Sequence, residues 1–284
     1  MTEKISENRA GDPRNSLTLH FLGTGAADHD WSDPAHPADR GSTSTLLNGM
    51  VLIDAGTTGF ENFRRAGAGM AGLTDIVFTH THRDHFQPNV VARILAERDR
   101  ELPPLGIWVT PGGAGRLAAP LKGLNCVIHP IRHGDAFTAG GLRFTALLSN
   151  HRVEDPEEET FWFLIAAPQG DLLYALDGAW MTPGAAAALL DRHLSWIVWD
   201  GTMEKAGDWR IFEHSDMEMI TSEIVGLRKR GSVDDRTVHI LSHIARTLWS
   251  PEPAATEHAK EKGFILAQDG MKIIFSGDGS FTVA

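Results

Sequence analysis

Four side chains of the kinds that bind metal ions lie in one short run, Phe-Thr-His-Thr-His-Arg-Asp-His at positions 78–85. They are His80, His82, Asp84 and His85, and they follow an apolar stretch, 75–78, that we expect to form a buried strand. Neutral imidazoles and a carboxylate are ligands for zinc, manganese or iron. The alternative is a polar His-rich turn, which we disfavour because polar groups beside a buried strand need partners. The run therefore predicts a metal centre at a strand end.

Further candidate ligands also follow apolar stretches. His151 comes after 144–149, Asp177 after 172–176 and His243 after 238–242, while Asp54 ends the stretch 51–53. Each of these residues alone is more typical of a cap or a turn. The repeated occurrence of such residues along the chain after the cluster is better explained by strand ends that meet at one edge of the sheets. We therefore expect their side chains to converge on the cluster at 80–85.

The elements that must position these residues form two runs of strands, each followed by helices, with no linker between the runs. Asn48-Gly49 and Gln169-Gly170 predict hairpins, and a last hairpin is expected from 264–267 and 271–275. Helices are expected at 88–101, 217–229 and 253–262, among others. We interpret residues 16–284 as one domain, with two sheets face to face and helices outside. Residues 1–15 are expected to be a disordered tail.

Composition limits the class of protein. The chain has 284 residues, of which 42% are hydrophobic and 22% charged, as in an ordinary globular protein. Its single cysteine, Cys126, excludes an intrachain disulfide framework. No apolar run approaches the roughly 20 residues that cross a bilayer, and the polar N-terminus lacks a secretion signal. These absences predict a cytoplasmic protein without a membrane partner.

Charge bears on the partners. The net charge of −11 argues against nucleic acid, which would require basic stripes, and leaves a small-molecule substrate as the expected partner. A small phosphorylated substrate remains compatible, because bound metal ions dominate the local field. The acidic run at 154–159 is expected to form a solvated loop, with a role as a lid left open by its position after His151.

Residues 17–275 resemble the metallo-β-lactamase superfamily. The matching runs are Leu-Gly-Thr-Gly at 22–25, Ile-Asp-Ala-Gly at 53–56, the cluster at 79–85, Asn-His at 150–151, Leu-Asp-Gly at 176–178 and Leu-Ser-His at 241–243. The resemblance implies an α/β fold, a four-layer αββα sandwich, with two divalent metal ions. It implies that one ion is held by His80, His82 and His151, that the other is held by Asp84, His85 and His243, and that Asp177 bridges them. It also implies that Asp54 positions the cluster loop.

The run Gln-Asp-Gly-Met-Lys-Ile at 268–273, with Gly-Thr-Gly at 23–25, is similar to one branch of that superfamily. The branch contains cyclic-phosphate phosphodiesterases, the pyrroloquinoline-quinone biosynthesis B protein and a transfer-RNA endonuclease. It implies a catalytic role for His214 at the leaving group, against the alternative of a surface residue that begins a helix. We assign Asp84 a double role, as ligand and as orienter of the nucleophile. Dimers in the family make a homodimer an expectation.

The sequence also departs from this branch. The phosphonate-pathway member carries a cysteine-rich zinc loop after its first strand, whereas residues 26–40 have no cysteine. This stretch offers other metal-binding side chains, which could hold a third ion or form a solvated loop over the site: Asp28, His29, Asp30, Asp33 and His36.

Three functions follow from these observations. The first is a metal-dependent hydrolase, a dinuclear phosphodiesterase for a small phosphate ester, cyclic or open-chain, in which Arg40 and Arg246 are candidates for holding the phosphate. The second is a lactone or thioester hydrolase on the same metal site, with an apolar pocket that tryptophans could line: Trp31, Trp162, Trp180 and Trp249. The third is a non-hydrolytic metalloprotein of cofactor biosynthesis. Zinc or manganese is expected, with iron as an alternative, although His82 argues against a diiron oxygen-reducing protein.

Overall fold

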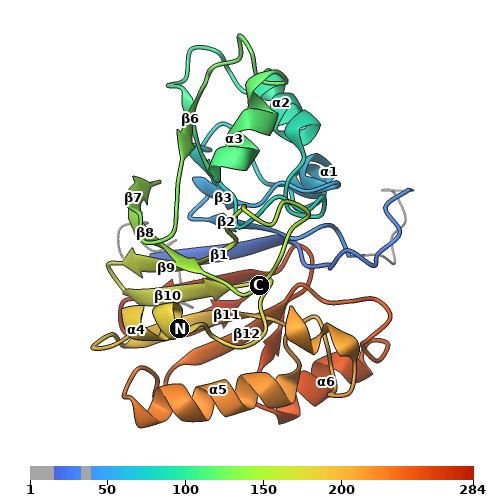
Figure 1. Ribbon diagram of the computed structural model, residues 1–284, viewed down its shortest axis with the longest axis vertical. Coiled ribbons are helices and arrows are strands. Elements are labelled where there is room, and N and C mark those ends of the chain that lie inside the picture. The colour runs from blue at the N-terminus through green and yellow to red at the C-terminus, as the bar shows by residue number, and fades with distance from the viewer. Residues whose placement is uncertain (1–15, 33–39) are drawn as a thin grey trace, which may run out of the picture.

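Two mixed β-sheets face one another, and helices cover the outer face of each sheet (Figure 1). The computed structural model describes residues 16–32 and 40–284 of the chain. One sheet has eight strands in the order β15-β14-β1-β2-β3-β4-β5-β6, and the other has seven in the order β13-β12-β11-β10-β9-β8-β7. This is the αββα sandwich that the resemblance implied. The expected tail at 1–15 lies outside the described residues, and the single domain stays a prediction.

The elements have the following bounds. The eight-stranded sheet contains β1 (Ser16–Gly23), β2 (Ser44–Leu47), β3 (Val51–Ile53), β4 (Asp75–Val77), β5 (Leu105–Val109), β6 (Cys126–Pro130), β14 (Lys272–Ser276) and β15 (Phe281–Val283). The seven-stranded sheet contains β7 (Ala136–Ala139), β8 (Leu142–Leu148), β9 (Phe161–Ala167), β10 (Gly170–Ala175), β11 (Leu194–Asp200), β12 (Val238–Ser242) and β13 (Ile265–Leu266). The helices are α1 (Gly59–Arg65), α2 (Pro88–Glu97), α3 (Pro111–Ala118), α4 (Pro183–Ala188), the 3₁₀-helix η1 (Trp209–Phe212), α5 (Met217–Lys229) and α6 (Ala254–Glu261).

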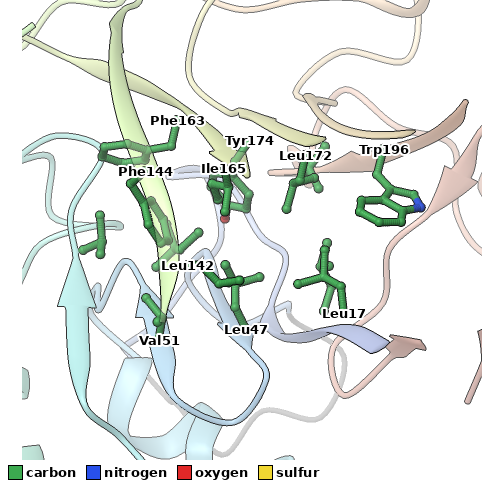
Figure 2. Close-up of a cluster of buried hydrophobic side chains, with 14 of the residues drawn as sticks. Leu17, Leu47, Val51, Leu142, Phe144, Phe163, Ile165, Leu172, Tyr174 and Trp196 are labelled. Atoms are coloured by element: carbon green, nitrogen blue, oxygen red, sulfur yellow. The ribbon is translucent and has the colours of Figure 1, made fainter. Parts of the chain in front are cut away.

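The main core lies between the two sheets. Figure 2 shows Leu17, Leu47 and Val51 from the first sheet opposite Phe163 and Tyr174 from the second. Alternate residues of each strand point into this layer, as the two-residue repeat of a strand requires. Burial of apolar area on this scale is the dominant stabilising term of the fold, and it fixes the two sheets relative to each other.

Two further apolar layers hold the helices. The helices α1, α2 and α3 pack on the outer face of the eight-stranded sheet, whereas α4, α5 and α6 pack on the seven-stranded sheet. Helix α5 begins at Asp216, whose carboxylate accepts hydrogen bonds from the backbone N–H groups of Glu218 and Met219. The structure gives α5 the bounds that the sequence predicted, 217–229.

The two hairpin signals gave correct predictions. Strands β2 and β3 pair antiparallel through a turn in which both Asn48 and Gly49 have left-handed backbone, with φ of 50° and 69°. Strands β9 and β10 also pair antiparallel across Gly170. None of the helices in the described part of the chain is long and apolar enough to span a membrane.

The expected last hairpin, 264–267 with 271–275, is wrong. Strand β13 pairs in parallel with β12, whereas β14 pairs antiparallel with β1 in the other sheet. The chain crosses between the sheets at Asp269, whose carboxylate accepts hydrogen bonds from Thr24 and from the backbone N–H of Gly41. A turn signal such as Asp-Gly does not distinguish a hairpin from a crossover, because the partners that fix the crossover are distant in sequence. Strands β7 and β15 were not predicted.

Candidate metal centre

Residues at the ends of strands from both sheets meet at one edge of the sandwich. The cluster loop at 79–85 follows β4 of the first sheet, whereas His151, Asp177 and His243 follow β8, β10 and β12 of the second. The structure thus brings together all the residues predicted as ligands, and it does so with the strand-end placement that the sequence indicated: His80, His82, Asp84, His85, His151, Asp177 and His243. Their roles as metal ligands stay a prediction, although the geometry can be tested against what a metal needs.

The first group consists of three imidazoles, His80, His82 and His151. The Nδ1 atom of His82 lies 3.1 Å from His80 Nε2 and 3.0 Å from His151 Nε2. Ligand atoms bound to one ion at about 2.1 Å lie roughly 3.0–3.4 Å apart, depending on coordination geometry. The spacing of the three nitrogens therefore fits a single transition-metal ion. The group is also partly open to solvent, because the His82 side chain is 27% exposed.

The second group consists of Asp84, His85 and His243, whose side chains are almost completely buried. Asp84 Oδ2 lies 3.4 Å from His85 Nε2 and 3.3 Å from His243 Nε2. These distances again fit one ion. This group carries a carboxylate, whereas the first is made only of imidazoles, so the second offers the stronger field for a cation.

Asp177 lies between the two groups: Oδ2 faces His85 of the second group, whereas Oδ1 faces histidines of both groups. Its Oδ2 atom is 3.0 Å from His85 Nε2, while Oδ1 is 3.3 Å from His243 Nε2 and 3.8 Å from His151 Nε2. His85 Nε2 and Asp177 Oδ2 are both buried, and neither makes a hydrogen bond within the described residues. Buried polar atoms without a partner are costly. A cation that both atoms approach would supply that partner, so the residues present fit a metal.

The protonation of the histidines also suits a metal. Burial lowers the pKa of His151 to about 4 and holds the pKa of His80 well below its ordinary value. Both are therefore neutral near pH 7, which is the form a metal requires. Burial also lowers the pKa of His85, but the carboxylates of Asp177, Asp84 and Asp54 outweigh it and raise that pKa well above its ordinary value. The field that favours a proton there also favours a metal cation.

One buried carboxylate of the first sheet orients two of the histidines. Asp54, at the end of β3, accepts hydrogen bonds from the backbone N–H and the hydroxyl of Thr79 and from His85 Nδ1, at 2.8–2.9 Å. The Thr79 hydroxyl has given its only proton to Asp54, so it accepts from His80 Nδ1, 3.0 Å away. Both imidazoles are thereby fixed with Nε2 toward the centre. This agrees with the positioning role predicted for Asp54.

The second sheet repeats this arrangement around a residue that sequence reasoning missed. Asp200, the last residue of β11, accepts hydrogen bonds from the Thr202 hydroxyl at 2.6 Å and from His214 Nδ1 at 2.8 Å. The Thr202 hydroxyl in turn accepts from His243 Nδ1 at 2.8 Å. Asp200 follows the apolar run Trp-Ile-Val-Trp at 196–199. The same strand-end pattern that indicated the other candidates would therefore have found it.

Three of these strand-end residues have left-handed backbone. Asp54, Asp177 and His243 have φ of 63°, 51° and 62°. Such a conformation costs a residue other than glycine on the order of 1 kcal/mol and persists only where the surrounding structure imposes it. Here it turns the side chains from the sheet toward the common centre.

His214 lies beside the ligand groups, between η1 and α5. Its ring centroid is 4.9 Å from that of His151, and its Nδ1 atom is 4.0 Å from Asp177 Oδ1. Burial lowers its pKa, but the neighbouring Asp200 carboxylate outweighs burial and raises that pKa to about 9. With Nδ1 bound to Asp200, Nε2 is the atom left for a substrate. The structure thus places His214 in the site and not on the outer surface of a helix.

A cavity of about 450 Å³ opens over the two groups. It is lined by His82, Asp84, Asp177 and His214, and also by Arg210, which the sequence analysis did not single out. Arg210 lies in the 3₁₀-helix η1, where neither a strand end nor a motif in the sequence indicates a role.

The arginines chosen from the sequence do not line this cavity. The Arg40 guanidinium donates to Thr24 Oγ1 and the Ala267 carbonyl oxygen and pairs with Glu252. It joins the Gly-Thr-Gly turn to the crossover, so its charge is used for structure. Arg246 is exposed and also lies outside the cavity wall.

The apolar pocket of tryptophans is not formed. Trp162 is buried in the core beneath α4 and α5, Trp249 packs against the same core, and Trp180 is 50% exposed. None of these residues, nor Trp31, lines the cavity. Tryptophan is a common core residue, and here the core explains two of the four positions.

Two loops border the cavity. Ala26, Ala27 and Asp28 line it, and the Asp28 carboxylate accepts hydrogen bonds from the backbone N–H groups of Arg246 and Thr247. Within the described part of this loop no three metal-binding side chains lie together. Positions 33 and 36, which were also candidates for a third ion, lie outside the described residues.

The acidic run is not a fully solvated loop. The Glu158 side chain is only 3% exposed and accepts hydrogen bonds from Thr110 and Arg116. Glu159 accepts one from the backbone N–H of His133. Glu154, in contrast, is 83% exposed and lies on the cavity wall. The loop is therefore anchored by two glutamates and presents a third to the site.

Comparisons with known proteins agree with this fold. The family model for the beta-lactamase superfamily domain matches residues 50–204. No curated protein matches the chain. The metallo-beta-lactamase fold protein YhfI from Bacillus subtilis is 12% identical, with a TM-score of 0.69 over 90% of this chain and 98% of that one. A new diphosphatase from the PhnP family is 20% identical, with a TM-score of 0.65 over 92% and 97%. Zn²⁺-bound PqqB from Methylobacterium extorquens is 15% identical, with a TM-score of 0.69 over 90% and 99%.

These structures include members of the branch that the sequence resembled. At such low sequence identity, these structures establish only that the fold is shared. The family model matches more than half of the chain and therefore establishes the family. The chain belongs to the beta-lactamase superfamily and has the metallo-β-lactamase fold.

Proposed function

We propose that this chain, a member of a superfamily composed largely of metal-dependent hydrolases, is a dinuclear phosphodiesterase that acts on a small phosphate ester. The observation that carries the proposal is the position of Asp177 between the two ligand groups, with Oδ2 toward His85 and Oδ1 toward both His243 of the second group and His151 of the first. A carboxylate shared in this way suits two ions held close together. Zinc or manganese fits the mixed imidazole and carboxylate ligands, with iron as an alternative.

Divalent ions bound by these groups would lower the pKa of a water and polarise a phosphoryl oxygen. Asp84 lines the cavity and belongs to the second group, so we assign it a double role, as ligand and as acceptor of a hydrogen bond from the attacking water.

We assign His214 the role of the general acid that protonates the leaving alkoxide. Asp200 holds its Nδ1 and keeps the ring protonated near pH 7, because the raised pKa of about 9 lies above that pH. His214 Nε2 is then a proton donor beside the cavity. General acid catalysis of this kind contributes typically about 10²–10⁴-fold to the rate.

Three observations support a small phosphate ester as the substrate. A cavity of about 450 Å³ lies within the usual range for small-molecule sites. The tryptophans that a lactone or thioester site would use lie elsewhere, and one structural neighbour is described as a diphosphatase. A small-molecule substrate, a cytoplasmic location and a homodimer remain our expectations, with no role for nucleic acid or membrane.

The test combines metal analysis with a substrate panel. Protein loaded with zinc, manganese or iron is expected to hold about two ions per chain and to hydrolyse bis(4-nitrophenyl) phosphate but not lactones. Exhaustive chelation should abolish the activity, and added metal should restore it. Full activity after chelation would contradict the proposal. Two bound ions with no hydrolysis of either substrate class would favour a non-hydrolytic metalloprotein.

A further inference from the structure

One arginine of the cavity wall is held in a fixed orientation. Arg210 Nη1 donates to both carboxylate oxygens of Asp208, at 3.0 and 2.9 Å, and the Arg210 backbone N–H donates to Asp208 Oδ1 at 2.9 Å. The guanidinium carbon lies 5.3 Å from the centroid of the Trp209 ring. Within the described residues these contacts use one terminal nitrogen, so the other N–H groups remain for a ligand. A planar guanidinium held in this way suits a phosphate.

Arg210 is also tied to the residue assigned as the acid. Its carbonyl oxygen accepts hydrogen bonds from the backbone N–H groups of Glu213 and His214, at 2.9 and 2.8 Å. In a 3₁₀ turn, residues three apart lie on the same face. Arg210 and Glu213 both line the cavity, so η1 presents one cation and one carboxylate to it.

Two carboxylates stand at the mouth of the cavity. Glu154 Oε2 lies 4.0 Å from His82 Nε2, and Glu213 Oε2 lies 4.0 Å from His151 Nδ1. Their side chains are 83% and 39% exposed, so solvent reaches both. The remaining charged groups of the wall, apart from the predicted ligands, are the protonated His214, Arg83, which is exposed, and Asp28, whose carboxylate is already bound by backbone N–H groups.

These charges have a consequence for the substrate. Resting on the proposed phosphodiesterase function, we propose that the cavity selects diesters by charge. Arg210 holds the single negative charge of the phosphodiester, while Glu154 and Glu213 favour a second alcohol that is cationic or neutral and repel one that is anionic. Because both glutamates are solvated, each contributes modestly. We expect the cationic and anionic diesters to differ by on the order of tenfold in kcat/KM.

A series of diesters with one leaving group tests the proposal. The probes are 4-nitrophenyl phosphate diesters whose second alcohol is choline, its uncharged isostere 3,3-dimethylbutanol, or 3-hydroxypropionate. Rates with the metal-loaded full chain are expected to fall in that order, because the reacting bond is the same and only the distant charge changes. At 0.5 M salt the differences should shrink, since the Debye length falls to a few ångströms.

Variants assign the effect to residues. The double variant Glu154→Gln, Glu213→Gln should bring the three rates within about twofold of one another, with metal content as the measure of folding. Glu157→Gln is the matched control, an exposed acid of the same loop outside the cavity wall. Arg210→Ala should lower kcat/KM for all three diesters alike with metal content unchanged, whereas Arg246→Ala should not.

The outcomes separate this inference from the function on which it rests. Equal rates for the anionic and cationic diesters, or discrimination that survives in the double variant, would overturn the charge selection while the phosphodiesterase stands. If the metal-loaded wild type hydrolyses none of the three diesters, the proposed function itself fails.

Discussion

Two buried aspartates, Asp54 and Asp200, hold the site from opposite sheets, and each binds one threonine hydroxyl and one histidine directly. Asp54 binds Thr79 and His85; Asp200 binds Thr202 and a histidine that is no predicted ligand, His214. Through its threonine, each aspartate also orients a further histidine that is a predicted ligand. The arrangement is the same, but the histidine bound directly to the aspartate differs in its assigned role: His85 is a predicted metal ligand and His214 is the proposed acid.

The pKa values of the two aspartates shift in opposite directions. Burial dominates at Asp54 and raises its pKa, although His85 and Thr79 act against it. At Asp200 burial also raises the pKa, but the positive charge of His214 and its hydrogen bond outweigh burial and lower it. We infer that the same arrangement has two functions. Asp54 orients two predicted metal ligands, His85 and His80. Asp200 orients one predicted ligand, His243, and keeps His214 protonated.

The largest expected effect is on turnover, and it distinguishes His214, bound to Asp200, from His85, bound to Asp54. His214→Ala should lower kcat by about 10²–10⁴-fold, because the leaving alkoxide loses its proton donor. Metal content should stay near two ions per chain, as measured by elemental analysis. His85→Ala, the matched variant on the Asp54 side, should lose an ion together with activity. Equal loss of metal and turnover in His214→Ala would contradict its role as an acid.

The next effect concerns Asp54 itself. Asp54→Asn should weaken metal binding by about 10–100-fold, as is typical when the partner of a metal-bound histidine is changed. Both ligand groups should be affected, because Asp54 positions His85 directly and His80 through Thr79. Competition with a chromophoric chelator measures the two affinities. Unchanged affinity at both groups would show that the backbone alone orients these rings.

The two threonines allow a matched pair of smaller changes. Thr79→Val should weaken the ion bound by His80, and Thr202→Val the ion bound by His243, each by roughly tenfold or less. Valine keeps the shape of threonine but removes the hydroxyl that joins aspartate to histidine. Chelator titration of the two variants should therefore show loss at different groups. The same loss in both would mean that the two sides are not independent.

The smallest effect is on pH dependence. The pKa of His214 is raised to about 9, so its acidic form is present at neutral pH and is lost as pH rises through that value. Bound cations act in the opposite direction, which places the alkaline limb of kcat at or below about pH 9. Asp200→Asn removes the charge that raises this pKa, so the limb should move to lower pH by about one unit or more. A profile of kcat against pH with an unmoved limb would exclude His214 as the acid.

Much of the fold could be predicted from the sequence because local signals decide it. Apolar runs of strand length, the Asn48-Gly49 turn and the periodicity of α5 each act over a few residues. The crossover at Asp269 could not be predicted in this way, because its partners Thr24 and Gly41 are more than 200 residues away.

The sequence by itself determined which predicted ligands meet, since each follows a strand and these strand ends lie at one edge of the sandwich. Only the tertiary structure decided how the two oxygens of Asp177 face the histidines of both groups, that Asp200 orients two histidines, and that Arg210 and not Arg40 lines the cavity. Those outcomes depend on side-chain direction and on hydrogen bonds between distant segments. Residue type and spacing do not encode them, because an arginine in the sequence can equally well form structural hydrogen bonds at a crossover or bind a substrate.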